Sequence, residues 1–139
     1  MLVKIVPALF ILLETSNILV LYFAPGSKYA NAVGVFTAWE KSKQSPEIHE
    51  FVKYLVNWVA GAKLMFLLLL AVIVLFADLR IQRLCLFALA LATASFYWRL
   101  FPLVRKIDRD GQIEPRKYSI TLGVMIFVFV IFLVAAAII

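Results

Sequence analysis

Four long apolar runs restrict the folds open to this chain, and they cover residues 5–23, 54–76, 81–104 and 118–139. A helix of about 20 apolar residues crosses a hydrocarbon core about 30 Å thick, so each run is long enough to span a membrane. The composition agrees, because 65% of the residues are hydrophobic and 16% are charged, whereas a soluble domain has roughly 45–50% and about 25%. The sequence therefore predicts an all-α polytopic integral membrane protein, a single domain over residues 1–139 with four transmembrane helices in an antiparallel bundle.

The charges and the metal-binding residue types exclude several classes of function. The net charge is +6, but the basic residues flank the apolar runs, where they orient a membrane protein and meet anionic lipid rather than nucleic acid. Cys85 is the only cysteine and His49 the only histidine. An intramolecular disulfide, a cysteine metal cluster and a bis-histidine haem are therefore excluded within one chain. No nucleophile–base pair or phosphate loop is evident, and we expect no metal, no cofactor and no catalytic residues.

Turn and helix-start signals lie between the apolar runs. Ala24-Pro25-Gly26 is a turn signal after the first run, and Asp110-Gly111 is one before the last. Ser45-Pro46-Glu47 predicts a helix start at Pro46, because serine can cap free N–H groups, proline fits the first helical position and an acid favours the helix dipole. Residues 77–80 predict a tight hairpin between the second and third helices.

The first connection carries apolar residues at helical spacing, followed by charged ones. The apolar set is Tyr29, Ala32, Val33, Phe36 and Trp39, and the charged set is Glu40, Lys41 and Lys43. An apolar face with a basic end is typical of a helix that lies in the membrane interface. We predict such an interfacial amphipathic helix over residues 29–43, with Val33, Phe36 and Trp39 turned toward the bilayer or the bundle. An ordered loop packed on the bundle is the alternative.

The distribution of basic residues predicts the orientation. We define side B as the side of the first and third connections, and side A as the side of the two termini. Side B carries Lys28, Lys41, Lys43, Lys53, Arg105, Lys106, Arg109, Arg116 and Lys117, and side A carries Lys4, Arg80 and Arg83. Nine basic residues against three favour side B as cytoplasmic. We therefore expect a protein of the cell membrane with both termini outside the cytoplasm.

Polar residues inside the apolar runs lie at similar depth, in the half of the bilayer nearest side B. Glu14 is about nine residues, or roughly 13 Å, from the side-B end of its run, and Lys63 is at a similar depth in the second run. Asn17 is one turn closer to side B, and Asn57 and Arg99 lie in the same half. A lone charge at mid-membrane costs about 3 kcal/mol. We therefore expect Glu14 to face inward, with Lys63 or Arg99 within direct or one-water reach.

Small residues on the third run favour the same inward arrangement. They form one stripe at i, i+4, i+7 and i+11, namely Ala88, Ala92, Ser95 and Arg99. A small-residue face allows helices to pack closely. Two alternatives stay open, because Arg99 and Lys63 can snorkel toward side B, and because a pair made by Glu14 can be a structural ion pair that fixes helix register.

The stretch AKLMFLLLLAVIVLFADLRIQRLCLFALAL, residues 62–91, is a leucine-rich segment, a short arginine-containing turn and a second apolar segment. It resembles the second and third helices of DoxX-like four-helix membrane proteins. The resemblance implies a compact bundle, often a partner of redox or other membrane enzymes, and it implies cytoplasmic termini, contrary to the charge distribution. Glu14 is also similar in placement to the membrane carboxylate of small multidrug resistance transporters, although TSNILVLYFAPG after it differs from their motif.

Two classes of function fit these features, with a membrane enzyme that uses Glu14 and His49 in acid–base chemistry as a third hypothesis. In the first class, the chain is a binding or accessory protein that holds an amphipathic or lipid-like ligand or organises a partner membrane protein. The candidate binding residues are Glu14, Asn17, Asn57, Lys63, Ser95 and Arg99, with an apolar lining of Phe10, Trp58 and Trp98. In the second class, the chain is a proton- or ion-coupled transporter or channel that acts as a homo-oligomer, and Glu14 exchanges a proton for substrate.

Overall fold

The computed structural model describes residues 2–139, which form helices and connections without a β-strand. The elements are α1 (Leu2–Phe23), the 3₁₀ helix η1 (Val33–Val35), α2 (Thr37–Ser42), α3 (Pro46–Phe76), α4 (Leu79–Ala94), α5 (Phe96–Arg109) and α6 (Tyr118–Ile138). Four helical segments are long and apolar enough to cross a membrane: α1, α3, α4 together with α5, and α6. The prediction of an all-α chain with four apolar helices of membrane length is therefore confirmed.

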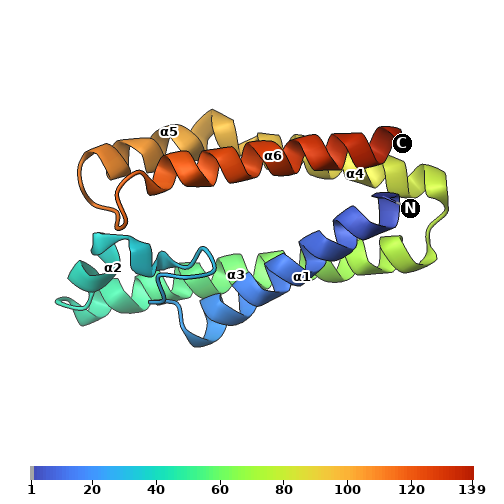
Figure 1. The fold of residues 1–139 in the computed structure, drawn as a ribbon. Coiled ribbons are helices and arrows are strands. Elements are labelled where there is room, and N and C mark those ends of the chain that lie inside the picture. Colours follow the sequence, from blue (N-terminus) through green and yellow to red (C-terminus); the bar gives the residue numbers. More distant parts are fainter. Residues whose placement is uncertain (1) are drawn as a thin grey trace.

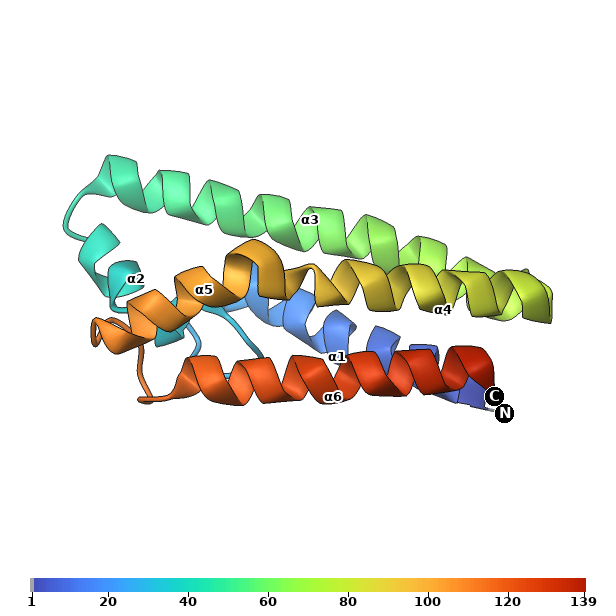
Figure 2. The ribbon, with the colours of Figure 1, turned by 90° about the horizontal axis from the view of Figure 1, so that it is seen from above.

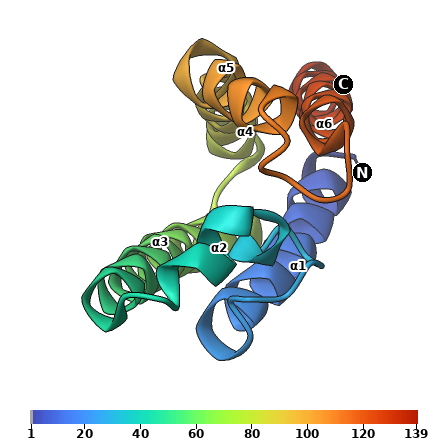
Figure 3. The ribbon, with the colours of Figure 1, turned by 90° about the vertical axis from the view of Figure 1, so that its left-hand side faces the viewer.

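Two helix pairs make up the molecule. α1 packs mainly on α3, and α4 packs mainly on α6, while α5 continues along α6. Figure 3 shows that the two pairs come together where α1 lies near α6 and are separated between α3 and α5. At one end α1 also contacts α6 and α4, and both chain termini lie at this end in Figures 1 and 2. This end is side A, and the end with α2 and the α5–α6 connection is side B.

The core consists of three clusters. The first lies at side A and joins the four apolar segments through Val3, Val6, Leu70, Leu86, Leu89, Ala90, Leu133, Ala136 and Ala137. The second joins α1, α3 and the first connection through Ile18, Leu21, Ala32, Val56, Ala60 and Leu67. The third lies at side B and contains Val35, Val104 and Ile113. Each long helix buries one stripe, and most of its remaining surface is apolar and exposed.

The third apolar run, predicted as one helix over residues 81–104, is covered by one membrane-length segment, Leu79–Arg109, but an interruption that was not predicted divides this segment into α4 and α5. The interruption lies at Ser95, between α4 and α5, and Figure 2 shows the chain change direction there. The Ser95 hydroxyl donates to the Ala92 carbonyl at 2.6 Å, and a bond of this kind competes with the helical ladder and bends helices. Just beyond, the Tyr97 hydroxyl donates to the Gly123 carbonyl at 2.5 Å, which ties α5 to α6.

The first connection is a structured loop followed by two short helices. The interfacial helix predicted over residues 29–43 is limited to η1 and α2. A continuous helix is prevented because Ala30 and Asn31 have positive φ, and because the Gly34 N–H donates to the Ser27 carbonyl at 3.1 Å. The packed loop, which was the alternative, therefore describes residues 29–32 better.

The predicted inward direction of this segment is confirmed. Trp39 is buried, Val33 packs against the cluster between α1 and α3, and Phe36 packs against the side-B cluster. Phe36 also pairs with Ile113 in an antiparallel bridge. This bridge connects the first connection to the last one at side B.

Candidate functional site

Glu14 lies on the packed face of α1. The buried residues of this helix recur at helical spacing and are Val3, Val6, Pro7, Asn17, Ile18 and Leu21. The Glu14 side chain falls on the same face and is 26% exposed. Its neighbours Thr15 and Ser16 are exposed and bond only to carbonyls of their own helix. The prediction that Glu14 faces inward is therefore confirmed.

Lys63 reaches Glu14 from α3. It belongs to the packed stripe of that helix, whose buried members are Val56, Ala60, Leu67 and Leu70. The Lys63 Nζ forms a salt bridge with Glu14 Oε2 and its side chain is 32% exposed. The same Nζ donates to Asn17 Oδ1 at 2.5 Å. Glu14 Oε2 is buried, and no hydrogen-bond donor besides this ammonium approaches it within the described chain, so the predicted Glu14–Lys63 pairing is confirmed.

Asn17 connects the ion pair to the first connection. It is 6% exposed, and its Nδ2 donates to the Ala30 carbonyl. The positive φ of Ala30 belongs to the turn that brings this carbonyl down to the level of Asn17. Polar contacts therefore run from the side-B loop through Asn17 and Lys63 to Glu14. We call Glu14, Asn17 and Lys63 the polar cluster.

Two further contacts link this loop to the second helix pair. The Tyr118 hydroxyl of α6 donates to Asn31 Oδ1, and Lys28 Nζ lies 2.8 Å from Glu114 Oε2. Hydrogen bonding to Lys28 lowers the pKa of Glu114, and hydrogen bonding to Glu114 raises the pKa of Lys28. Because this pair is exposed, it contributes little to stability. The pair instead holds two segments in position, because it joins the loop that covers the polar cluster to the last connection.

Arg99 lies outside the polar cluster, so the inward arrangement, one of the two left open for this residue, is wrong. It is exposed on α5, and it takes part in no salt bridge between described residues. The predicted stripe of Ala88, Ala92, Ser95 and Arg99 faces outward, since all of its members are exposed. The packed stripe of α4 is instead Gln82, Leu86, Leu89 and Ala90. A packed stripe at helical spacing was therefore predicted correctly, but it was placed on the wrong face of the helix.

The predicted apolar lining does not come together. Trp58 and Trp98 are 64% and 79% exposed, and Asn57 is exposed too. Phe10 alone lies beside the cluster, where its ring stacks on Phe129 with centroids 5.0 Å apart and meets Phe66 edge-on at 6.3 Å. These three rings join α1, α3 and α6, and they are apolar neighbours of the ion pair rather than a pocket with the tryptophans.

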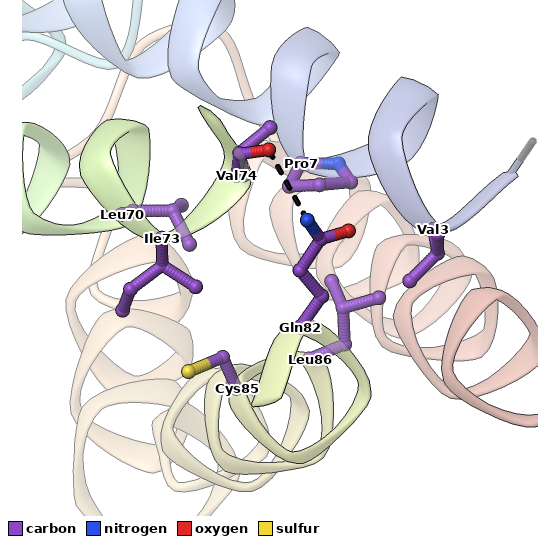
Figure 4. Close-up of a pocket in the computed structure, with 8 residues that line it drawn as sticks. All are labelled: Val3, Pro7, Leu70, Ile73, Val74, Gln82, Cys85 and Leu86. Atoms are coloured by element: carbon purple, nitrogen blue, oxygen red, sulfur yellow. Dashed lines mark hydrogen bonds between the residues drawn. The ribbon is translucent and has the colours of Figure 1, made fainter. Parts of the chain in front are cut away.

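Gln82 is a buried polar residue that the sequence reasoning missed. It is 4% exposed, and its Nε2 donates to the carbonyls of Val74 at 3.2 Å and Ala77 at 2.9 Å. It therefore satisfies carbonyls at the end of α3 that lack a helical partner. The narrow apolar hollow beside it, drawn in Figure 4, leaves no room for a water molecule. The signal available in the sequence was a single amide side chain at a core position of an apolar run. In this structure that amide caps the end of α3 and is not a ligand-binding group.

His49 is engaged at the junction of α2 and α3. Its Nδ1 lies 2.8 Å from Ser42 Oγ, and its ring centroid is 4.8 Å from that of Trp39. The Ser42 hydroxyl donates to the Trp39 carbonyl at 2.7 Å, so its proton is not directed at the imidazole. The pair therefore packs the short helix α2 against the start of α3, and the hypothesis of acid–base chemistry shared with Glu14 gains no support.

Comparison with protein-family models, curated proteins and solved structures finds no match to this chain. The resemblance to DoxX-like proteins therefore stays a prediction. Among residues 2–139, no group of three or more histidine, cysteine, aspartate or glutamate side chains could hold a metal ion. The polar cluster is consequently the arrangement on which a function can be argued.

Proposed function

We propose that this chain is an integral membrane protein of the binding class, in which the four apolar segments cross the bilayer as an antiparallel bundle. We propose further that the polar cluster receives the polar head of an amphipathic molecule. The observation that carries this proposal is the residual exposure of the ion pair, 26% for Glu14 and 32% for Lys63. The exposed part of the pair would face lipid at a cost within the membrane, and a polar headgroup bound there removes that cost.

The opposite charges of the polar cluster favour a ligand with a zwitterionic headgroup. Glu14 offers carboxylate oxygens to an ammonium group, and Lys63 offers N–H donors to a phosphate. The buried amide of Asn17 and the Ala30 carbonyl continue the polar contacts of the pair toward side B, the side from which a headgroup would enter. The aromatic rings of Phe10 and Phe66 lie where an apolar chain would follow the head.

Replacing Glu14 by glutamine tests this function. The change keeps the shape of the side chain but removes the charge that attracts an ammonium group. We expect the affinity for lysophosphatidylethanolamine to fall about tenfold or more, since one charge-assisted hydrogen bond is worth about 1.5–3 kcal/mol. Native mass spectrometry of the detergent-purified protein, titrated with this lipid, measures the change, and thermal unfolding is recorded in parallel.

Ser16→Ala is the matched control, because Ser16 lies beside Glu14 in the chain but is exposed and bonds only to the Leu13 carbonyl. This variant should bind the lysolipid as the wild type does. If Glu14→Gln lowered the unfolding temperature but left lysolipid binding unchanged, the ion pair would be structural and the proposed function would be wrong.

Labelling tests the proposed orientation, which rests on the excess of basic residues at side B. A cysteine at Gln112 or after Ile139, each in a Cys85→Ser background, is treated in intact cells with a label that cannot cross the membrane. We expect reaction at the C-terminal cysteine and not at position 112. Reaction at position 112 alone would place the termini in the cytoplasm, as the DoxX-like resemblance implies.

A further inference from the structure

α5 differs from the other long helices in its charge. Its exposed basic side chains are Arg99, Arg105, Lys106 and Arg109. They fall on one side of the helix, because they follow one another at spacings that include i+3, i+4 and i+7. We call these four residues the basic face.

The opposite side of α5 packs against the rest of the protein. Val104 is buried and belongs to the side-B cluster, and Tyr97 donates to the Gly123 carbonyl of α6. Gly123 permits this approach, because a Cβ there would lie 2.7 Å from Phe101 Cε2. Tyr97, Phe101 and Val104 therefore hold α5 on α6, and this contact keeps the basic face turned outward.

No residue of the basic face forms a salt bridge within residues 2–139, although Arg105 lies beside Asp108. The salt bridges found there join other residues, namely Lys28 with Glu114, Lys43 with Glu40 and Lys63 with Glu14. Asp108 lies on the same helix but is occupied by α6, since it accepts from the Ser119 N–H at 2.9 Å and from the Ser119 hydroxyl at 2.5 Å. Arg99, Lys106 and Arg109 are therefore free to meet an external anion.

The length of the helix places this face at the headgroup layer. α4 has 16 residues, or about 24 Å of helix, and about four more residues complete a hydrocarbon core about 30 Å thick. That point is reached near Trp98, which is 79% exposed, and exposed tryptophan is typical of the membrane interface. Lys106 and Arg109 then lie beyond the core, among the lipid phosphates.

From this placement we infer that the basic face of α5 is a docking surface for the headgroups of anionic phospholipids in the side-B leaflet. Arginine forms bidentate hydrogen bonds with phosphate, and three of the four basic side chains are arginine. Each basic residue near an anionic surface contributes about 1 kcal/mol, or roughly a fivefold preference. The inference rests on the membrane placement proposed above but not on ligand binding by the polar cluster.

Quenching of Trp98 by brominated lipids tests this surface. The protein, in a Trp58→Phe background in which the one other tryptophan, Trp39, is buried, is reconstituted with brominated phosphatidylglycerol in phosphatidylcholine, and with the reverse pair. We expect anionic lipid to be enriched about fivefold or more beside Trp98, and this preference should weaken in 1 M NaCl. In the triple variant Arg99→Gln, Lys106→Gln, Arg109→Gln the enrichment should be lost. Arg105 is retained there because it lies beside Asp108.

The matched control is Lys4→Gln, Lys41→Gln, Arg80→Gln, which removes the same charge from exposed positions away from α5. It should keep the wild-type enrichment. Three outcomes would overturn the inference: a wild type without lipid preference, a preference that salt leaves unchanged, or equal losses in the two triple variants. The last would show that net charge, not this face, attracts the lipid. Unchanged lysophosphatidylethanolamine binding in Glu14→Gln would refute the proposed ligand but leave this result untouched, so the two proposals fail separately.

Discussion

Lys63→Glu is expected to destabilise the protein by about 3–5 kcal/mol, because it removes one partner of a largely enclosed ion pair and places a second carboxylate beside the first. Glu14 would lose the ammonium that approaches its buried Oε2. Asn17 would lose the donor that its Oδ1 accepts at 2.5 Å. Unfolding in a mixed detergent titration, followed by circular dichroism, measures the change in free energy of unfolding.

The charge-swapped double variant Glu14→Lys, Lys63→Glu separates pairing from mere burial of charge. It restores one cation and one anion at the same two positions, so we expect it to recover about half of the lost stability or more. Lys53→Glu, on an exposed site of the same helix, should change stability by less than about 0.5 kcal/mol. A swapped variant no more stable than Lys63→Glu would show that the two side chains do not stabilise each other.

The helices could be predicted from the sequence because their signals are local. Apolar runs of membrane length gave the long helices, and the Ser45-Pro46 signal gave the start of α3 at Pro46, although the Ser45 side chain makes no capping bond. The interruption at Ser95 could not be predicted, since it depends on a hydroxyl that bonds the Ala92 carbonyl inside an otherwise apolar run. Over residues 29–32 the sequence could not decide between the interfacial helix and the packed loop, because the loop conformation depends on contacts with other segments.

The polar cluster was predictable in part, for a similar reason. The cost of a buried charge is independent of fold, so Glu14 and Lys63 at equal depth on consecutive helices could be paired with each other. The choice of Arg99 as a further partner required knowing which face of α5 meets α6, and small-residue spacing alone does not decide this. The Ala30 carbonyl that Asn17 contacts was not predictable, because a backbone group leaves no mark in the sequence.

Gly34→Ala is expected to lower the free energy of unfolding by about 3 kcal/mol, at the upper end of the range for overpacking. A Cβ at this position would lie 2.0 Å from the Gly26 carbonyl oxygen and 2.5 Å from that of Ser27. Both atoms belong to backbone, so no side-chain rotation can relieve the overlap, and the hydrogen bond from the Gly34 N–H to the Ser27 carbonyl must break. Detergent unfolding measures the loss, and hydrogen exchange at Gly34 reports the broken bond.

Gly111→Ala is the matched control, because Gly111 has a φ of 71° but no atom within 4 Å of its would-be Cβ. Its cost is limited to the left-handed backbone, about 1 kcal/mol. The two variants should also differ in hydrogen exchange far from the substituted residue. Opening the loop at Gly34 withdraws the Ala30 carbonyl from Asn17, so Gly34→Ala should increase hydrogen exchange in the middle of α1, whereas Gly111→Ala should not. Equal stability and equal exchange in the two variants would mean that the loop does not hold the polar cluster in place.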